Sequence, residues 1–199
     1  MTLEKQDAEL FYELWFPLLD FVNQKYRVCP GMGTIDRSRG VDAAEAKKIA
    51  DYLWSHTEVL QGYIAYAKLP EEQAQIVAGW VQCKPGKYIM ERHLKKGTVF
   101  ISEDDQTVYM VKGLFSTWEE MLGKGSVLLD AVLIPFKDMI ISDGLVRVYP
   151  FHFGRGYSEA FKDIYRKAKE GKTIRFSLSG GEPEHRPNTE KKPARWKAM

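Results

Sequence analysis

Cysteine is scarce in this sequence, and its scarcity excludes one common way of holding a small fold together. Cys29 and Cys83 are the two cysteines among 199 residues, and they do not have C-x-x-C spacing. Two such cysteines cannot build a disulfide framework, so we expect two reduced thiols in a cytoplasmic protein. No cluster of metal-ligating residues occurs at a recognisable spacing, and we predict neither a metal nor another cofactor.

Long apolar runs are missing as well. No uninterrupted apolar segment approaches the roughly 20 residues that a membrane helix needs. The opening residues, "MTLEKQDAEL", lack the basic-then-apolar order of a signal peptide. We therefore expect a soluble intracellular chain that has no membrane as a partner.

No charge of one sign dominates the composition. The chain has 29 basic and 27 acidic residues, and residues 179–199 contain five of the basic and three of the acidic ones. The preceding residues are therefore neutral in sum, which gives no overall electrostatic reason to bind nucleic acid, although a local basic patch is still compatible with that sum. We favour a protein over a nucleic acid as the partner.

The motifs of several enzyme classes are absent too. The sequence contains no G-x-S-x-G, no H-E-x-x-H and no P-loop. Gly154 and Gly156 precede a predicted helix start, which is a place where anions bind. The third glycine of a dinucleotide-binding loop is missing, however, because residue 159 is a glutamate, whose charge competes with a phosphate.

The first half of the chain shows helical periodicity. In "DAELFYELWFPLLDFVNQKY", apolar residues recur at helical spacing and form a broad face, with Pro17 in the polar stripe. Asp42 begins a capping-box pattern that opens a second helix, and Pro70 with two following glutamates marks another helix start. We expect three or four helices in residues 4–83, with the second running on or breaking near Gly62.

The second half changes to strand patterns. "TVFISEDDQTVYMV" has β-branched and aromatic runs on either side of a turn, which predicts a hairpin. "SVLLDAVLIPF" is apolar on both faces except at Asp130, as is typical of a strand covered on both sides. "STWEEML", capped by Ser116, and "SEAFKDIYRKAKEG", capped by Ser158, predict helices, and "KTIRFSLS" predicts a last strand.

These patterns together predict an α+β fold, with an N-terminal helical layer packed on a small antiparallel sheet or partly open barrel. The helical region is expected over residues 1–84. The β region is expected over residues 85–178, with one further helix at about 157–170. Residues 179–199 have three prolines and no periodicity, so a disordered tail is predicted there.

Asp143 and Gly144 lie between the apolar runs "DMIIS" and "LVRV", which is a strong signal for a two-residue hairpin turn. Such a turn pairs Ser142 with Leu145. It also brings the apolar residues of both runs onto one face, namely Met139, Ile141, Val146 and Val148. We therefore interpret Asp143 as a turn residue rather than as a catalytic acid.

Two side chains are candidates for a catalytic site. His152 stands between two phenylalanines and, in an extended chain, points away from both, as a general base in a cleft would. Asp130 is a carboxylate in an otherwise apolar strand, where it needs a cation or several donors. If His152 meets Asp130 or Asp143 between the two regions, the protein is a hydrolase-like enzyme. If it does not, Asp130 is expected to form a salt bridge with a neighbouring strand, or to lie at a bulge or a strand end.

Four arginines are candidates for binding. Arg37 and Arg39 lie in a glycine-rich loop, where they hold an anion or are simply solvated. Arg147 and Arg155 lie close in sequence to His152 on either side. Because no titratable cluster occurs at a recognisable spacing, we favour a non-catalytic binding or interaction module over an enzyme. Such a module would use the barrel rim, the aromatic first helix or the tail.

The segment "LLDAVLIPFKDMIISDGLVRVYPFHFG" resembles a box found in uncharacterised bacterial proteins. In that box an apolar strand and Pro-Phe precede Asp-Gly-Leu and a strand that closes in Phe-Gly. Some of those proteins end in a cysteine-rich zinc motif, whereas this chain has no cysteine after Cys83. The resemblance therefore implies a compact β unit in a bacterial protein, without the metal module and without an assigned activity.

Overall fold

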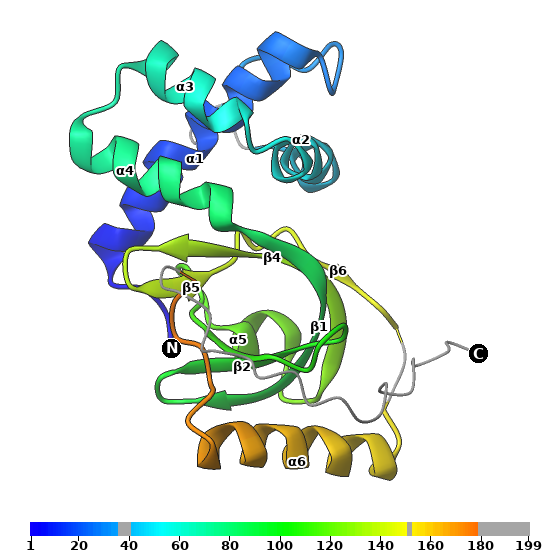
Figure 1. Cartoon of the computed structure of the whole chain (residues 1–199). Coiled ribbons are helices and arrows are strands. Elements are labelled where there is room, and N and C mark those ends of the chain that lie inside the picture. The colour runs from blue at the N-terminus through cyan, green and yellow to red at the C-terminus, as the bar shows by residue number, and fades with distance from the viewer. Residues whose placement is uncertain (36–40, 151–152, 179–199) are drawn as a thin grey trace.

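A computed structural model of the chain describes residues 1–35, 41–150 and 153–178, and it shows an α+β fold (Figure 1). The first part of the chain is helical, with α1 (Lys5–Tyr26), α2 (Ala43–Ser55), α3 (Val59–Ala67), α4 (Glu71–Gly79) and the 3-10 turn η1 (Trp80–Gln82). The strands follow as β1 (Lys84–Leu94), β2 (Gly97–Ser102), β3 (Val108–Val111), β4 (Val127–Phe136), β5 (Met139–Ile141) and β6 (Arg147–Val148). Two further helices are α5 (Trp118–Leu122) and α6 (Arg155–Glu170). The predicted fold class is thus confirmed.

Capping sets the helix boundaries. The Asp42 carboxylate accepts hydrogen bonds from the backbone N–H groups of Ala44 and Glu45 at 2.9 and 3.1 Å, as expected of an N-cap. The predicted break near Gly62 is wrong, because α2 already ends at Ser55 and α3 continues through Gly62. Tertiary packing outweighs the modest cost of a glycine in a helix, since Leu60 and Tyr63 are buried on either side of it.

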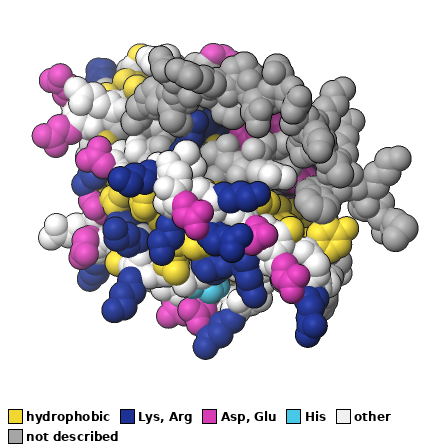
Figure 2. Space-filling view, turned by 60° about the horizontal axis from the view of Figure 1, so that its bottom comes forward, with side chains coloured by type: hydrophobic (Ala, Val, Ile, Leu, Met, Phe, Trp, Pro, Cys, Tyr) yellow, Lys and Arg dark blue, Asp and Glu magenta, His cyan; other side chains and the backbone are white. Residues whose placement is uncertain are grey.

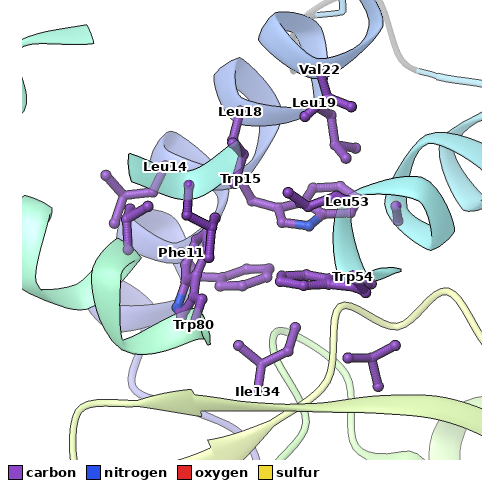
Figure 3. Close-up of a cluster of buried hydrophobic side chains, with 14 of the residues drawn as sticks. Phe11, Leu14, Trp15, Leu18, Leu19, Val22, Leu53, Trp54, Trp80 and Ile134 are labelled. Carbon is purple, nitrogen blue, oxygen red and sulfur yellow. The ribbon is translucent and has the colours of Figure 1, made fainter. Parts of the chain in front are cut away.

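The helical layer is built around α1. The apolar side chains of its inner face are those of Phe11, Leu14, Trp15, Leu18, Leu19 and Val22. Figure 3 shows them gathered with Leu53 and Trp54 of α2 and with Trp80 of η1, above Ile134 of β4. Pro17 lies on the exposed side, as its position in the polar stripe predicts. The layer therefore covers the outer face of β4 and β5.

The strands form a partly open ring. β1 pairs antiparallel with both β2 and β4, β2 pairs with β3, and β4 pairs with β5. A single parallel residue pair, Val111 with Ile140, joins β3 to β5, so the ring stays partly open at this point. This order, with α5 between β3 and β4, is the connectivity of an OB-fold barrel. The interior is filled by large side chains, among them Tyr88, Met90, Phe100, Trp118, Leu129 and Leu133.

α5 plugs the ring with Trp118, and its start differs by one residue from the prediction. Thr117, not Ser116, is the N-cap. The Thr117 hydroxyl accepts a hydrogen bond from the Glu120 N–H, and the Glu120 carboxylate accepts one of 2.7 Å from the Thr117 N–H. The sequence offers two hydroxyls in a row, each with a glutamate three residues on. With Thr117 as the cap, the helix begins at Trp118, whose side chain is buried.

α6 covers the barrel on the side away from the helical layer (Figure 1). Its inner face, which includes Phe161 and Ala168, packs on β2 and β3. The helix begins after Gly154 rather than at the predicted cap Ser158. Beyond it, Arg175 forms an isolated parallel bridge with Tyr109 instead of the last strand that was predicted. The β2–β3 surface, on which OB-fold barrels bind oligonucleotides and oligosaccharides, is therefore covered by the chain itself.

The predicted hairpin at Asp143 and Gly144 is wrong. β5 folds back on β4 through a turn in which Lys137 has a φ of 53°. β6 also pairs with β4, so Ser142 does not pair with Leu145. The apolar residues of the two runs do not share a face: Ile141 packs in the core under the helical layer, whereas Val148 is exposed. β4 is long enough to pair with both β5 and β6, and these two pairings replace the predicted pairing of β5 with β6.

Candidate functional site

A cleft of about 280 Å³ opens between α2 and the sheet of β1, β4 and β6. Lys47 and Asp51 of α2 form one wall. The other lining residues are contributed by the strands and are Pro85, Gly86, Lys87, Asp130, Ala131, Val132 and Arg147. We call this cleft the strand cleft. It contains Asp130 and Arg147, two of the residues that the sequence marks as candidates.

Strand pairing places three charged residues in one row of the cleft. Lys87 of β1 lies opposite Asp130 of β4, and Asp130 lies opposite Arg147 of β6. Directly opposed residues of antiparallel strands project from the same face of a sheet. The next residues along, Tyr88 and Leu129, point into the barrel, so the row of Lys87, Asp130 and Arg147 lies on its outside.

Asp130 is half-buried in the middle of this row. Its Oδ2 accepts a hydrogen bond of 2.8 Å from the Tyr149 hydroxyl, which raises the pKa of Tyr149 because the neutral phenol is the donor. The Lys87 ammonium lies 5.3 Å from the centroid of the Tyr149 ring. In the described residues Asp130 is thus held by a tyrosine, and the salt bridge expected within the sheet does not form.

The strand cleft has more positive than negative side chains. Three cations, Lys47, Lys87 and Arg147, face two carboxylates, Asp51 and Asp130. Lys47 forms an ion pair with Asp51 along α2. Among the described residues, no ion pair includes Lys87 or Arg147, and both side chains are exposed. Two cations on the strands that flank β4 are therefore accessible to a ligand.

Asp143 does not line the cleft but lies buried under α2, with 5% of its surface exposed. Its Oδ2 accepts from the Trp54 indole N–H at 2.8 Å, and its Oδ1 accepts from the Leu145 N–H at 3.0 Å. Burial raises the pKa of this carboxyl to about 6, although the two hydrogen bonds oppose the change. The chain bends at Gly144, which has a φ of 80°, but Asp143 joins α2 to the barrel and does not stand at an exposed hairpin tip.

A larger hollow, of about 510 Å³, lies between α1 and α3. It is lined mainly by apolar and aromatic side chains, including Phe21, Tyr63 and Tyr66. Its charged groups already have intramolecular contacts: Asp20 accepts from the Ile35 N–H at 2.8 Å, and the Lys25 ammonium lies over the Phe21 ring. The strand cleft, in which Lys87 and Arg147 have no carboxylate partner among the described residues, is the better candidate for a charged ligand.

The remaining predicted residues do not join this site in the described structure. His152, Arg37 and Arg39 lie outside the described residues, so the pairing of His152 with Asp130 stays a prediction. Arg155 is the first residue of α6 and is exposed outside the strand cleft. Sequence reasoning missed Lys47, Asp51, Lys87 and Tyr149, because no local pattern brings α2 next to β1 or the segment after β6.

The described residues contain no group of three or more His, Cys, Asp or Glu side chains placed to hold a metal ion. None of their helices combines the length and the apolar character needed to cross a membrane.

No protein-family model, curated protein or solved structure matches the chain. The OB-type connectivity is therefore derived from the strand order alone, and function has to be argued from the side chains of the site.

Proposed function

We propose that the chain is a binding module without catalytic activity of its own, and that the strand cleft binds a small ligand with an anionic group and hydroxyls, such as a phosphorylated sugar. The observation that carries this proposal is the row of Lys87, Asp130 and Arg147, with two cations that have no carboxylate partner among the described residues.

The spacing of the row suits such a ligand. Neighbouring strands lie about 4.8 Å apart, so the backbones of Lys87 and Arg147 are separated by about 10 Å, and their long side chains can converge on one anion. Asp130 lies between them, with one oxygen already bonded to Tyr149. Its other oxygen would repel a bare phosphate but accepts a hydrogen bond from a sugar hydroxyl. The volume of about 280 Å³ is at the small end of ligand sites.

The lining favours binding over catalysis. In the described part of the chain, the strand cleft is lined by no serine, cysteine or histidine, so no hydroxyl or thiol nucleophile of these types and no imidazole base faces a ligand there. Asp143, the carboxyl group whose pKa is raised toward neutrality, is shielded from the cleft by burial and by Trp54. The solvent-exposed cations of Lys87 and Arg147, beside the Asp130 carboxylate, support ligand recognition rather than proton transfer.

Isothermal titration calorimetry with glucose 6-phosphate, inorganic phosphate and glucose tests this proposal. The sugar phosphate is expected to bind more tightly than either part. The double variant Lys87→Ala/Arg147→Ala should weaken binding by at least about tenfold, since each charged hydrogen bond contributes about 1.5–3 kcal/mol. Lys84→Ala is the matched control, because Lys84 is exposed on the same strand but does not line the cleft. Equal losses in the control and the double variant, or no binding by the unaltered chain, would refute the proposal.

A further inference from the structure

The charge of the molecule is unevenly distributed along its length. Residues 1–83 contain eight basic and twelve acidic residues, whereas residues 153–178 contain seven basic and three acidic ones. The helical layer and α6 lie at opposite ends of the molecule in Figure 1. Figure 2 shows many Lys and Arg side chains on the face of the molecule that includes α6, interspersed with acidic and hydrophobic side chains. The α6 segment therefore has an excess of four positive charges, and residues 1–83 have an excess of four negative charges.

α6 holds its basic residues in a fixed direction. Because Phe161 and Ala168 are buried against the barrel, the opposite side of the helix must face solvent. Lys162 and Lys169, seven residues apart, are exposed on one flank of the helix, and neither forms an ion pair among the described residues. The stripe opposite the buried side carries Arg166 together with three carboxylates, those of Glu159, Asp163 and Glu170. Arg166 pairs with Asp163 at 3.0 Å. The helix thus presents cations to solvent without needing to rearrange.

The β1–β2 hairpin adds lysines beside an exposed aromatic ring. Lys95 and Lys96 form its turn and are both exposed. The Lys96 ammonium lies 6.0 Å from the centroid of the Phe176 ring, which is 48% exposed. The backbone of the preceding residue, Arg175, is fixed by two hydrogen bonds of 2.8 Å, from the Met110 N–H and to the Val108 carbonyl. Phe176 is thus an anchored, accessible ring among cations.

We infer that this surface binds single-stranded nucleic acid. We call it the α6 face and define it by Lys95, Lys96, Tyr157, Lys162, Lys169, Lys172 and Phe176. Cations that follow a phosphate backbone, together with aromatic rings on which bases stack, are the features that sequence-tolerant single-strand sites share. Tyr157, 46% exposed near the start of α6, provides a second ring at the other end of the helix.

Other polyanions fit the α6 face less well. A basic amphipathic helix can lie on a membrane, but it does so by inserting its apolar side, and that side of α6 is buried on β2 and β3. A duplex would satisfy the lysines, yet its bases are already stacked and offer nothing to Phe176 or Tyr157. The rings therefore favour a single strand.

Fluorescence anisotropy with labelled oligo(dT) and oligo(rU), using the full chain, tests the inference. Lys162→Glu/Lys169→Glu should weaken binding by at least about tenfold and reduce the slope of log affinity against log salt by about 2, one per phosphate contact. Lys5→Glu/Lys48→Glu makes the same change in net charge on the helical layer and should leave affinity nearly unaltered. Circular dichroism checks that every variant is folded.

Phe176→Ala tests the stacking contribution separately. Loss of one stacked base should weaken binding by about tenfold. Phe115→Ala is its matched control, because Phe115 is 47% exposed but lies outside the α6 face. The inference fails if the controls weaken binding as much as the α6-face variants do, or if an equally long duplex binds as tightly. Binding to phosphatidylserine vesicles but not to oligonucleotides also overturns it, as does binding that none of the α6-face variants changes.

Discussion

The barrel has two covers, and they differ in thickness, charge and the way they are attached. The helical layer lies over β4 and β5 and encloses a core of its own, in which Trp15, Trp54 and Trp80 are buried. α6 is a single helix over β2 and β3 and contributes one apolar stripe. The layer contains more acidic than basic residues, and the α6 segment shows the reverse. Both covers bury the outside of the sheet, but only the α6 segment combines this with a net positive charge.

The attachment differs in its polar chemistry as well. α2 is joined to the barrel by a buried hydrogen bond from Trp54 to the Asp143 carboxylate. α6 is joined by side-chain packing and by the Arg92 guanidinium, which lies 4.5 Å from the centroid of the Tyr165 ring and also forms an ion pair with Glu91. A buried bond to a carboxylate is sensitive to pH and to substitution, whereas a partly exposed cation–π contact is weak. We therefore expect the layer to dominate stability and α6 to open more readily.

The largest effect is expected in the centre of the helical layer. Trp80 is fully buried and its ring centroid lies 5.6 Å from that of Phe11, so Trp80→Ala should lower the free energy of unfolding by about 3–5 kcal/mol. Urea denaturation followed by circular dichroism measures this change. Tyr66→Ala, in the same layer but 72% exposed, should change it by no more than about 0.5 kcal/mol. If Trp80→Ala and Tyr66→Ala lower the free energy of unfolding by similar amounts, the helical layer does not contain a hydrophobic core of its own.

Asp143 should make stability depend on pH. Its pKa is about 6 in the folded protein against 3.8 for the free group, so the folded state binds more protons between these values. Stability then falls as pH rises through this window, by at most about 3 kcal/mol. Asp143→Asn removes this titrating group. The free energy of unfolding is measured at pH 4 and at pH 7.5 for each protein, and the difference between the two values is compared, so that any pH-independent cost of the amide cancels. If the unaltered chain and Asp143→Asn lose the same stability between these pH values, Asp143 is not the group responsible.

Side-chain periodicity was sufficient to predict much of the architecture. The inner face of α1, the β2–β3 hairpin and the inward residues of α6, such as Phe161, all follow from the spacing of apolar side chains. The error at Asp143 has a definite cause. Asp-Gly favours a two-residue turn, but the chain only bends at Gly144, because each of the flanking strands pairs with β4 and not with the other.

The site was less predictable than the fold. Asp130 and Arg147 were identified as unusual by their residue types, but Lys47 and Lys87 reach the strand cleft from elements about 40 residues apart, which no local pattern connects. The basic α6 segment is visible in the sequence, yet a charge sum over the whole chain cancels it against the acidic helical layer. Charge counted per predicted element rather than per chain would have revealed it.

A smaller effect is expected in α6. Ile164 is partly buried against the barrel, so Ile164→Ala should cost about 1–2 kcal/mol, less than a fully buried side chain. Hydrogen exchange should show faster exchange of the α6 amides while the β1–β4 amides stay protected. Lys162→Ala, on the exposed side of the same helix, is the control. If hydrogen exchange becomes equally faster in α6 and in the barrel, the two open together, and α6 does not open more readily than the rest of the fold.

The smallest effect is expected at Tyr149, and it sharpens the contrast between two carboxylates. Tyr149→Phe removes the hydroxyl that donates to Asp130, but water can replace it in the open strand cleft, so stability should change by about 0.5 kcal/mol or less. Trp54→Phe removes the donor to Asp143, where water cannot enter, and should cost about 2 kcal/mol or more, part of it from lost volume. Urea denaturation at pH 7.5 compares the two. If Tyr149→Phe is as damaging as Trp54→Phe, the bond to Asp130 is part of the structural framework, and the row of Lys87, Asp130 and Arg147 is not free to receive a ligand.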